Sequence, residues 1–505
     1  MWICCFCINQ HRVVHQLKTK RLGCLLEGFN DDLLQDEINF YDSFKQRVTG
    51  IGHLLVMLSP WNRPEYLDRL WCIFEYHTAF QHGCTVSIVL PGKEKESLES
   101  KLIGINGRGV SELYDALAKT DVQRAKASFE LDKQRILRMI EKHPGYGVLN
   151  NQVNNHLREW VRATVRRAIV DRASIATKCV VPLGEAKFYN RVCCVLKDNG
   201  EFEIALEMAE RALESVADED EVYFGPRGCT REIQKALAYS YIGSILFFKA
   251  DYNGALKELR KALSLRQSIF GKDHPETAAS HAAIGNILAK LGMDDIAMEK
   301  HTTALKIRKQ QSSTDGGNVD LASSYADIGS IYCSQGDYRT ALCFNNQALN
   351  ILGRNKFDPV CANIYSNIGR VYLKKGDYDM AMVNFEKTLE VQEKVLGKMN
   401  HRTAACYHNI GTVLYKMGDF AKAGAYFQQS QEIFASVFGA EHPEAIASLY
   451  NLAFALDKNG CDYNVALNAY RKAAESFKKI NGPDNRQSMI CSRAIHRIQS
   501  ELLFS

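Results

Sequence analysis

The 505-residue chain has no long apolar run and no strong charge of either sign. A membrane-spanning helix needs roughly 18 or more consecutive apolar residues, so we expect no transmembrane segment. The 63 Lys and Arg residues exceed the 58 Asp and Glu residues by only 5, which is too little to indicate nucleic acid or a charged membrane surface as a partner. The apolar start, residues 1–8, has neither a basic leader nor a small-residue cleavage site and so does not match a signal peptide. We expect a cytoplasmic protein.

Motifs that bind cofactors or metals are also scarce. The glycine-rich stretch at residues 104–109 is not followed by the Lys-Ser/Thr of a phosphate-binding loop. His11 and His15 have a metal-ligand spacing, but no Glu lies between them in the zincin position and no second cluster follows. We therefore predict neither a cofactor nor a metal ion. Most of the 16 cysteines lie in helical or strand patterns, which favours reduced thiols over a disulfide framework. Four are expected to be small packing residues of helices: Cys333, Cys343, Cys361 and Cys406.

From about residue 235 to residue 475 the sequence repeats itself. Glycine recurs in steps of 42, 44, 40 and 42 residues, at Gly243, Gly285, Gly329, Gly369 and Gly411. An alanine follows each glycine twelve residues later, at Ala255, Ala297, Ala341, Ala381 and Ala423. Small residues at both positions let two antiparallel helices cross closely. A fixed period of this length is the signature of a solenoid.

Each unit has a turn between its two expected helices, as in Gly376-Asp377-Tyr378, and a longer loop between units. That loop carries a Gly-x-x-His-Pro phrase at Gly271–Pro275 and again at Gly439–Pro443. The pattern resembles tetratricopeptide repeats in the long form of the kinesin light chain and nephrocystin group. The resemblance covers about half of the chain. It implies a mostly α-helical protein, with six to seven repeats forming an αα-superhelix at residues 181–480 and a capping helix at 481–505.

The first part of the chain has a different pattern. Short apolar runs at residues 2–8, 53–58 and 85–90 read as strands, and residues 65–82 read as a helix. Strands that alternate with helices predict parallel βαβ units. We therefore expect a small α/β domain at residues 1–105 and a helical extension at 106–180.

One motif of this domain resembles the Trp-Cys-x-x-Glu element of TIR domains. Ser59 follows the second expected strand, and the next helix carries Arg69-Leu70-Trp71-Cys72-Ile73-Phe74-Glu75. It also resembles an uncharacterised protist group in which an Asn-Gln-His strand end, here Asn9–His11, precedes such a helix. In NAD-cleaving TIR domains this glutamate is catalytic, so the resemblance implies Glu75 as a catalytic residue that binds ribose and stabilises an oxocarbenium-like transition state. Alternatively, Trp71, Cys72 and Phe74 are the core face of the helix, and Glu75 is a solvated or capping acid.

This resemblance is incomplete at its start. A TIR domain opens with a strand and helix that line the nucleotide pocket, whereas this sequence begins at what would be the second strand. The Ser59-to-Trp71 separation is also a few residues longer than in that family. The domain is then either a divergent relative or N-terminally incomplete, and Met1 inside a strand pattern favours the second.

The resemblance to tetratricopeptide repeats implies a peptide groove along the first helix of each unit. Asparagine stands two residues before the glycine position at Asn367 and Asn409, and Asn451 stands two before Ala453, which replaces the glycine of a sixth unit. In related repeats this amide hydrogen-bonds the backbone of a bound peptide, since it can donate and accept at once. Cations follow the glycine position in several units and lie on a similar helix face: Lys290, Arg370, Lys374, Lys416 and Lys458. These residues favour an extended acidic peptide or a C-terminal carboxylate. Alternatively, the lysines complement the dipole at the end of their helix.

The preferred function is that of a non-catalytic scaffold or adaptor that binds proteins or extended peptides with its repeats, while the first domain self-associates or binds a regulator. The first alternative is a TIR-type NAD hydrolase, or its degenerate relative, regulated by the repeats. The second is a kinesin light chain-like cargo adaptor. Such adaptors grip the motor with a long coiled coil, but residues 1–185 show no sustained heptad because Pro144 and several glycines interrupt it.

Overall fold

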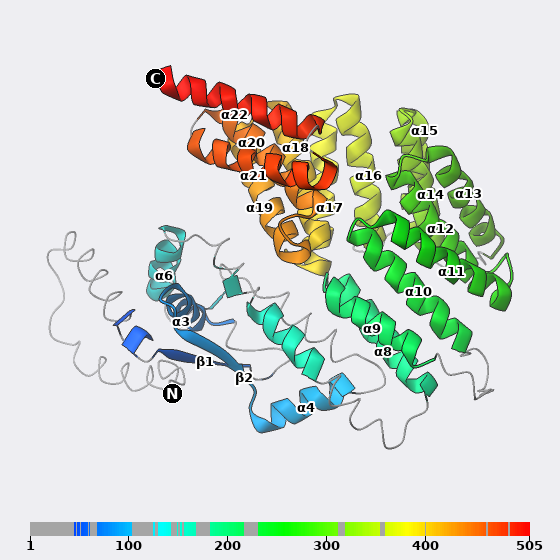
Figure 1. Ribbon diagram of the computed structural model, residues 1–505, viewed down its shortest axis with the longest axis horizontal. Coiled ribbons are helices and arrows are strands. Elements are labelled where there is room, and N and C mark those ends of the chain that lie inside the picture. Colours follow the sequence, from blue (N-terminus) through cyan, green and yellow to red (C-terminus); the bar gives the residue numbers. More distant parts are fainter. Residues whose placement is uncertain are drawn as a thin grey trace. The chain divides into compact units, whose positions relative to one another are not determined.

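The chain divides into two units, Met1–Ile175 and Ala176–Ser505, which are drawn in Figure 1 and described separately. The computed structural model describes residues 45–46, 48–50, 52–58, 60, 68–103, 125–126, 130–142, 149, 152–153, 156–167, 182–216, 231–311, 319–353, 359–398, 400–460, 463–482 and 485–504. The expected strand at residues 2–8, the Asn9–His11 phrase, His15, Ser59 and the glycine-rich stretch 104–109 lie outside these residues.

The first unit contains two parallel strands connected through a helix. Strand β1 (His53–Met57) pairs with β2 (Thr85–Val89) from His53 opposite Thr85 to Met57 opposite Val89. Helix α3 (Leu70–Gln81) lies between them in the sequence and packs on both strands. This βαβ unit is the one predicted for residues 53–90. Further described helices include α4 (Gly92–Ile103), α6 (Glu130–Lys142) and residues 156–167.

Burial in this unit follows the strand and helix periods. Leu54 and Val56 are buried in β1 while His53 and Met57 are exposed, as expected when successive side chains point to opposite faces. Helix α3 is buried nearly all round from Cys72 to Ala79, which is typical of a helix enclosed by other elements rather than one lying on a surface.

The described residues of the second unit form seven consecutive helix pairs. They are α8 (Pro182–Asp198) with α9 (Phe202–Glu214), α10 (Arg231–Phe248) with α11 (Tyr252–Phe270), α12 (Pro275–Lys290) with α13 (Asp294–Gln311), α14 (Val319–Ser334) with α15 (Tyr338–Leu352), α16 (Pro359–Lys375) with α17 (Tyr378–Leu396), α18 (His401–Met417) with α19 (Phe420–Phe438), and α20 (Pro443–Asn459) with α21 (Tyr463–Asn481). A last helix, α22 (Arg486–Phe504), packs on α21 (Figure 1). The expectation of a mostly α-helical repeat solenoid is confirmed.

The recurring glycines lie where the two helices of a pair cross. In five pairs the glycine of the first helix faces the side chain sixteen residues later in the second helix: Gly243 with Leu259, Gly285 with His301, Gly329 with Asn345, Gly369 with Phe385, and Gly411 with Phe427. A Cβ on Gly285 would approach the His301 ring to 2.6 Å, closer than packed atoms allow. The close helix crossing that the glycine spacing predicted is therefore present in the structure.

The turn inside each pair both ends one helix and begins the next. Gly376 has a φ of +83°, a left-handed conformation that glycine adopts without strain. The following Asp377 caps α17, because its side chain accepts a hydrogen bond from the backbone N–H of Met380. Asp251, Asp337 and Asp419 cap the second helices of their pairs in the same way. The turn expected between the two helices therefore also supplies the N-cap of the second helix.

The first helices lie on the inner side of the curved array. Each first helix contacts the first helix of the next pair, for example α14 with α16. Between successive second helices the described residues show no comparable contact. Neighbouring units are therefore closer along the first-helix face, which makes this face concave.

Two further sequence expectations concern cysteines and membranes. Cys333, Cys361 and Cys406 are buried in repeat helices as expected, but Cys343 on α15 is exposed, so the prediction that it fills the core was wrong. Among the described residues, every helix is too short or too polar to cross a bilayer.

Candidate functional site

All eight residues predicted for the peptide groove lie on first helices. Helix α12 carries Lys290, and α16 carries Asn367, Arg370 and Lys374. Helix α18 carries Asn409 and Lys416, and α20 carries Asn451 and Lys458. The first helices therefore carry these residues in a repeat-related array, but the contacts of the side chains differ from one helix to the next.

The three residues of α16 contact the preceding first helix, α14. The Asn367 amide donates to the backbone carbonyl of Ala326 at 3.3 Å. Arg370 donates to Ser330 Oγ at 3.4 Å, and Lys374 Nζ donates to the carbonyl of Cys333 at 3.3 Å. Cys333 lies in the last turn of α14, where carbonyl groups lack partners within the helix. Lys374 therefore complements the negative end of the dipole of α14. The alternative interpretation of these lysines assigned them this role at the end of their own helix.

Asn451 is also engaged between helices. Its amide nitrogen lies 3.2 Å from His408 Nε2, and His408 Nδ1 lies 2.9 Å from Ser448 Oγ. Burial lowers the pKa of His408 below its ordinary value, although the Glu444 carboxylate opposes the shift. A neutral imidazole can accept the amide N–H of Asn451 at one nitrogen and donate to Ser448 at the other. The contact therefore joins α18 to α20.

The three remaining lysines, on α12, α18 and α20, differ in their partners. Lys290 Nζ lies 3.9 Å from Glu444 Oε1, and both side chains are about half exposed, at 53% and 50%. Lys416 and Lys458 are exposed, and the described residues offer neither of them an ion pair or hydrogen bond. Asn409 is half-buried, and its amide likewise has no hydrogen-bond partner in the described part of the chain. Asn409, Lys416 and Lys458 are thus available to an outside ligand.

An acidic residue that the sequence reasoning missed shares the register of the asparagines. Asp327 lies two residues before Gly329, as Asn367 does before Gly369. Its Oδ2 is 3.6 Å from Nδ1 of the buried His301, and 26% of its side-chain surface is exposed. Burial raises the pKa of Asp327 to about 7, with Arg308 opposing the shift, and burial lowers the pKa of His301 to about 4. Extending the glycine register backward by one unit would have found this residue.

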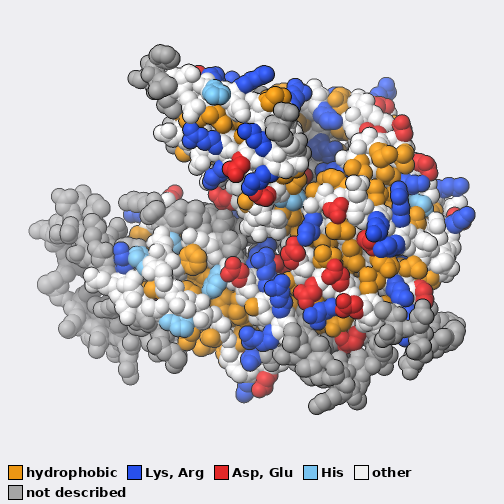
Figure 2. Space-filling view, in the orientation of Figure 1, with side chains coloured by type: hydrophobic (Ala, Val, Ile, Leu, Met, Phe, Trp, Pro, Cys, Tyr) orange, Lys and Arg blue, Asp and Glu red, His pale blue; other side chains and the backbone are white. Residues whose placement is uncertain are grey.

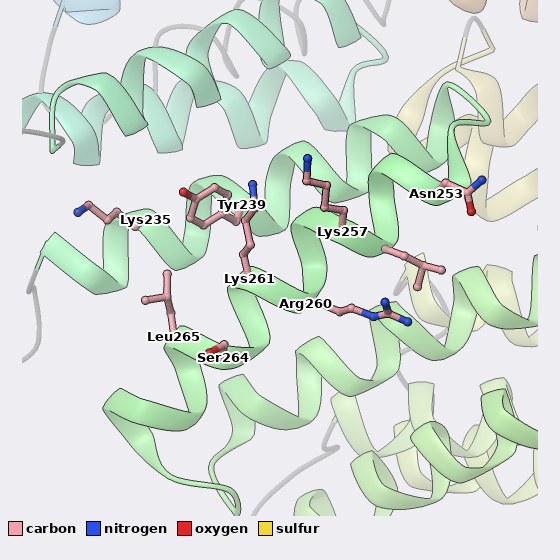
Figure 3. A pocket seen from close by; sticks show the side chains of 9 residues that line it. Lys235, Tyr239, Asn253, Lys257, Arg260, Lys261, Ser264 and Leu265 are labelled. Carbon is pink, nitrogen blue, oxygen red and sulfur yellow. The ribbon is translucent and has the colours of Figure 1, made fainter.

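A basic hollow of about 840 Å³ lies on α10 and α11, away from the predicted site (Figure 3). Its lining includes Lys235, Tyr239, Lys257, Arg260 and Lys261. Lys261 is held by Glu258 at 2.9 Å and lies 4.9 Å from the centre of the Tyr239 ring. The hollow could accept an anionic group, but no further feature of its lining specifies one. The sequence signal for it is the cluster of cations at residues 257–261.

Charge is mixed over the viewed face of the molecule. Figure 2 shows Lys and Arg side chains interspersed with Asp and Glu over the repeat helices, without one continuous field of a single sign. The candidate site therefore depends on a few local cations rather than on the charge of the whole surface.

Glu75, the candidate catalytic residue, lies in the middle of α3 and is only 1% exposed. Its neighbours Cys72, Ile73, Phe74 and Tyr76 are buried as well. Burial of Cys72 and Phe74 agrees with the core-face alternative, whereas the expectation of a solvated Glu75 was wrong. A substrate could contact this carboxylate only after the residues that cover it had moved.

Sequence comparison identifies the helix pairs. A family profile described as tetratricopeptide repeat matches residues 234–310, 360–429 and 402–479. The helix pairs within these residues, α10 to α13 and α16 to α21, are tetratricopeptide repeats. No curated protein matches the chain.

Several solved structures resemble parts of the chain. The repeats of a kinesin light chain-type protein from Podosopora anserina are 20% identical with a TM-score of 0.34, covering 41% of this chain and 97% of that one. BtubC from P. vanneervenii is 16% identical with a TM-score of 0.30, covering 51% and 91%. A Rap protein in complex with competence and sporulation factor is 16% identical with a TM-score of 0.44, covering 81% and 99%.

Proposed function

We propose that this protein is a non-catalytic scaffold that binds an extended acidic peptide along the first-helix face of its tetratricopeptide repeats. The observation that carries the proposal is the set formed by Asn409, Lys416 and Lys458. Their polar groups have no partner among the described residues, yet they lie on two adjacent first helices of one concave face.

The chemistry of this set suits a peptide main chain with acidic side chains. The Asn409 amide can donate to a peptide carbonyl and accept from a peptide N–H. Lys416 lies seven residues further along α18, so it shares the helix face of Asn409. Each exposed lysine contributes only about 0–1 kcal/mol to an ion pair, so affinity requires several such contacts along one strand. Recognition by a row of weak contacts fits an extended segment better than a compact ligand.

The remaining predicted residues have a supporting role in this proposal. Asn367, Arg370 and Lys374 hold α16 against α14, and Asn451 holds α20 against α18 through His408. Fixed helices keep the face rigid, which reduces the entropy lost when a peptide binds. Glu75 is not used in this proposal, because only 1% of the residue is exposed. The kinesin-adaptor alternative likewise has no support from a described coiled coil.

The test is direct binding of a fluorescein-labelled oligoglutamate peptide to the full chain, followed by anisotropy at low ionic strength. We expect the double variant Lys416→Glu/Lys458→Glu to bind at least about tenfold more weakly, equivalent to about 1.4 kcal/mol. The matched control is Lys306→Glu/Lys472→Glu, which reverses two exposed lysines on the second helices α13 and α21. Equal losses in the two double variants would mean that net charge, and not the first-helix face, governs binding, and this would overturn the proposal.

A further inference from the structure

Two helix starts late in the array contact two helix ends near its beginning. Asn400 is the N-cap of α18, and its side-chain oxygen accepts from the backbone N–H of Arg402 at 2.9 Å. Its amide nitrogen also donates to the carbonyl of Asp198 at 3.3 Å, although 202 residues separate the two. Asp198 is the last residue of α8. One side chain therefore caps the start of its own helix and the end of a distant one.

His442 makes the same pair of contacts one repeat later. It is the N-cap of α20, where its Nδ1 accepts from the backbone N–H of Glu444 at 3.3 Å. Its Nε2 donates to the carbonyl of Phe248, the last residue of α10, at 2.8 Å across 194 residues of sequence. The last carbonyls of a helix have no partner within it, so both bonds satisfy acceptors that would otherwise need water. The negative ends of α8 and α10 also face the positive starts of α18 and α20, which is electrostatically favourable.

An aromatic cluster lies at the same contact, with one ring each from the start of α9, the end of α10, the start of α18 and the end of α19. The rings of Phe202 and Phe438 stack with centroids 5.1 Å apart, and Phe202 lies 5.2 Å from Phe248. The His401 ring lies edge-on to Phe248 at 4.9 Å and to Phe438 at 5.5 Å. Phe202 and His401 are buried, with 4% and 6% exposed. Aromatic pairs of this kind stabilise a contact beyond the effect of the area that they bury.

The backbones approach closely at this contact. A Cβ on Gly200 would lie 2.9 Å from the Val437 side chain, so glycine is needed there for space as well as for its φ of +78°. The Lys290–Glu444 ion pair, from the end of α12 to the first turn of α20, lies on the same boundary. The superhelix therefore touches itself after one turn.

The contact is not a general property of the Gly-x-x-His-Pro loop. His274 occupies the same place before α12 and also stacks on a phenylalanine, with its ring 4.4 Å from that of Phe270. Its Nδ1 accepts from Glu276 N at 3.2 Å, as His442 does from Glu444. In the described part of the chain, however, His274 has no partner in another turn of the superhelix. His274 therefore only caps its own helix, whereas His442 also joins two turns of the superhelix.

We propose that Asn400, His442 and the cluster of Phe202, Phe248, His401 and Phe438 form a clasp that closes the superhelix on itself, and that opening of this clasp regulates entry of an extended peptide to the first-helix face. The regulatory half rests on the proposed function. While the clasp is closed, the inner face cannot be reached between the two touching turns. An extended strand can still enter lengthwise, whereas a folded partner cannot. The clasp consists of two hydrogen bonds and one aromatic cluster, with the Lys290–Glu444 ion pair beside it, so opening it disrupts far fewer contacts than unfolding a helix pair.

The experiment compares the full-length double variant Asn400→Ser/His442→Ser with His274→Ser. Serine is a strong N-cap, so α18, α20 and α12 keep their caps, but it is too short to reach the carbonyls of Asp198 and Phe248. Amide hydrogen exchange would be followed at residues 197–203, 246–252, 397–404 and 437–446. We expect exchange there to rise by about tenfold in the double variant, with unchanged far-ultraviolet circular dichroism. In His274→Ser these segments should exchange as in the wild type.

Unchanged exchange in the double variant would overturn the clasp. The association rate of the fluorescein-labelled oligoglutamate peptide then tests regulation, and we expect it to be about threefold or more faster in the double variant. If exchange becomes faster but the association rate does not change, the clasp is a structural contact only. That result would overturn the proposal that its opening regulates peptide entry. If no protein binds the peptide, the proposed function and the regulation that rests on it both fail, while the exchange result still decides whether the clasp exists.

Discussion

Gly369 and Phe385 pack so closely that a Cβ on Gly369 would lie 2.8 Å from Cε1 of the Phe385 ring. Phe385 is fully buried between α16 and α17, and it belongs to the core that these helices share with α18. The crossing distance of the pair is therefore set by the absence of a side chain on one helix and the presence of a large ring on the other.

Gly369→Ala should destabilise the protein. Alanine favours the helix by about 1 kcal/mol relative to glycine, but the added methyl group forces the ring or the helices apart at a cost of about 1–3 kcal/mol. We expect a net loss of about 1 kcal/mol, measured as a lower urea midpoint by circular dichroism.

Gly424→Ala is the matched control for this substitution. Gly424 is also a buried helical glycine, but a Cβ there would lie 3.9 Å from its nearest neighbours, Ala455 and Leu452, which is ordinary contact. Gly424→Ala should therefore raise the free energy of unfolding by up to about 1 kcal/mol. Equal effects at the two glycines would show that the crossing does not depend on the missing side chain.

The cap of α17 gives a second prediction. Asp377 accepts from Met380 N at 3.2 Å, so Asp377→Ala should cost about 1 kcal/mol of stability. Asp377→Ser should restore most of the loss, because serine can accept the same bond. The urea midpoints of the two variants check this, and a serine variant as unstable as the alanine variant would contradict the capping role.

The local parts of this structure could be predicted from the sequence because they depend on neighbouring residues. The spacing from Gly369 to Ala381 predicted a close helix pair, and the apolar runs near residues 53 and 85 predicted parallel strands. Both are confirmed. The cap made by Asp377 was missed, although its signal, an acidic residue directly before a helical pattern, is present in the sequence.

The contacts between distant repeats could not be predicted in this way. The meeting of Asn400 with Asp198 depends on the curvature of the whole array, which accumulates from small rotations between neighbouring pairs. For the same reason, the sequence predicts the same role for Asn367 and Asn409, since each stands two residues before a repeat glycine. Only the approach of α16 to α14 shows that the first is engaged by its neighbour and the second is not.

The raised pKa of Asp327 makes a third prediction, about pH. The carboxyl has a pKa of about 7 in the folded protein, above its ordinary value of 3.8, so the folded state binds more protons than the unfolded state between these values. Stability should therefore fall as the pH rises from about 4 to about 7. Asp327→Asn removes this penalty, and its melting temperature should exceed that of the wild type by a margin that grows between pH 5 and pH 8.

His301 faces the same carboxylate and titrates in the opposite sense. Its pKa is lowered to about 4 from the ordinary 6.5, so its contribution to stability is complete above pH 6.5 and is lost as the pH falls toward 4. The Asp327→Asn variant should still lose stability at acid pH, since the pKa of His301 is lowered by burial and by Arg308. A constant difference between variant and wild type from pH 5 to pH 8 would contradict the raised pKa of Asp327.

The fourth prediction separates a residue that holds the repeats together from one that contacts a ligand. Asn367→Ala removes the hydrogen bond to Ala326 and should cost about 0.5–1.5 kcal/mol of stability. Asn409→Ala removes no hydrogen bond within the described residues, so its stability should change by less than about 0.5 kcal/mol. Its affinity for the oligoglutamate peptide should nevertheless fall by about threefold or more, because a backbone hydrogen bond to the ligand is lost. Urea midpoints and anisotropy titrations on the same two variants measure both quantities. If Asn409→Ala lost stability and kept its affinity, the amide would be a packing group, and the peptide would have to be recognised elsewhere on the first-helix face.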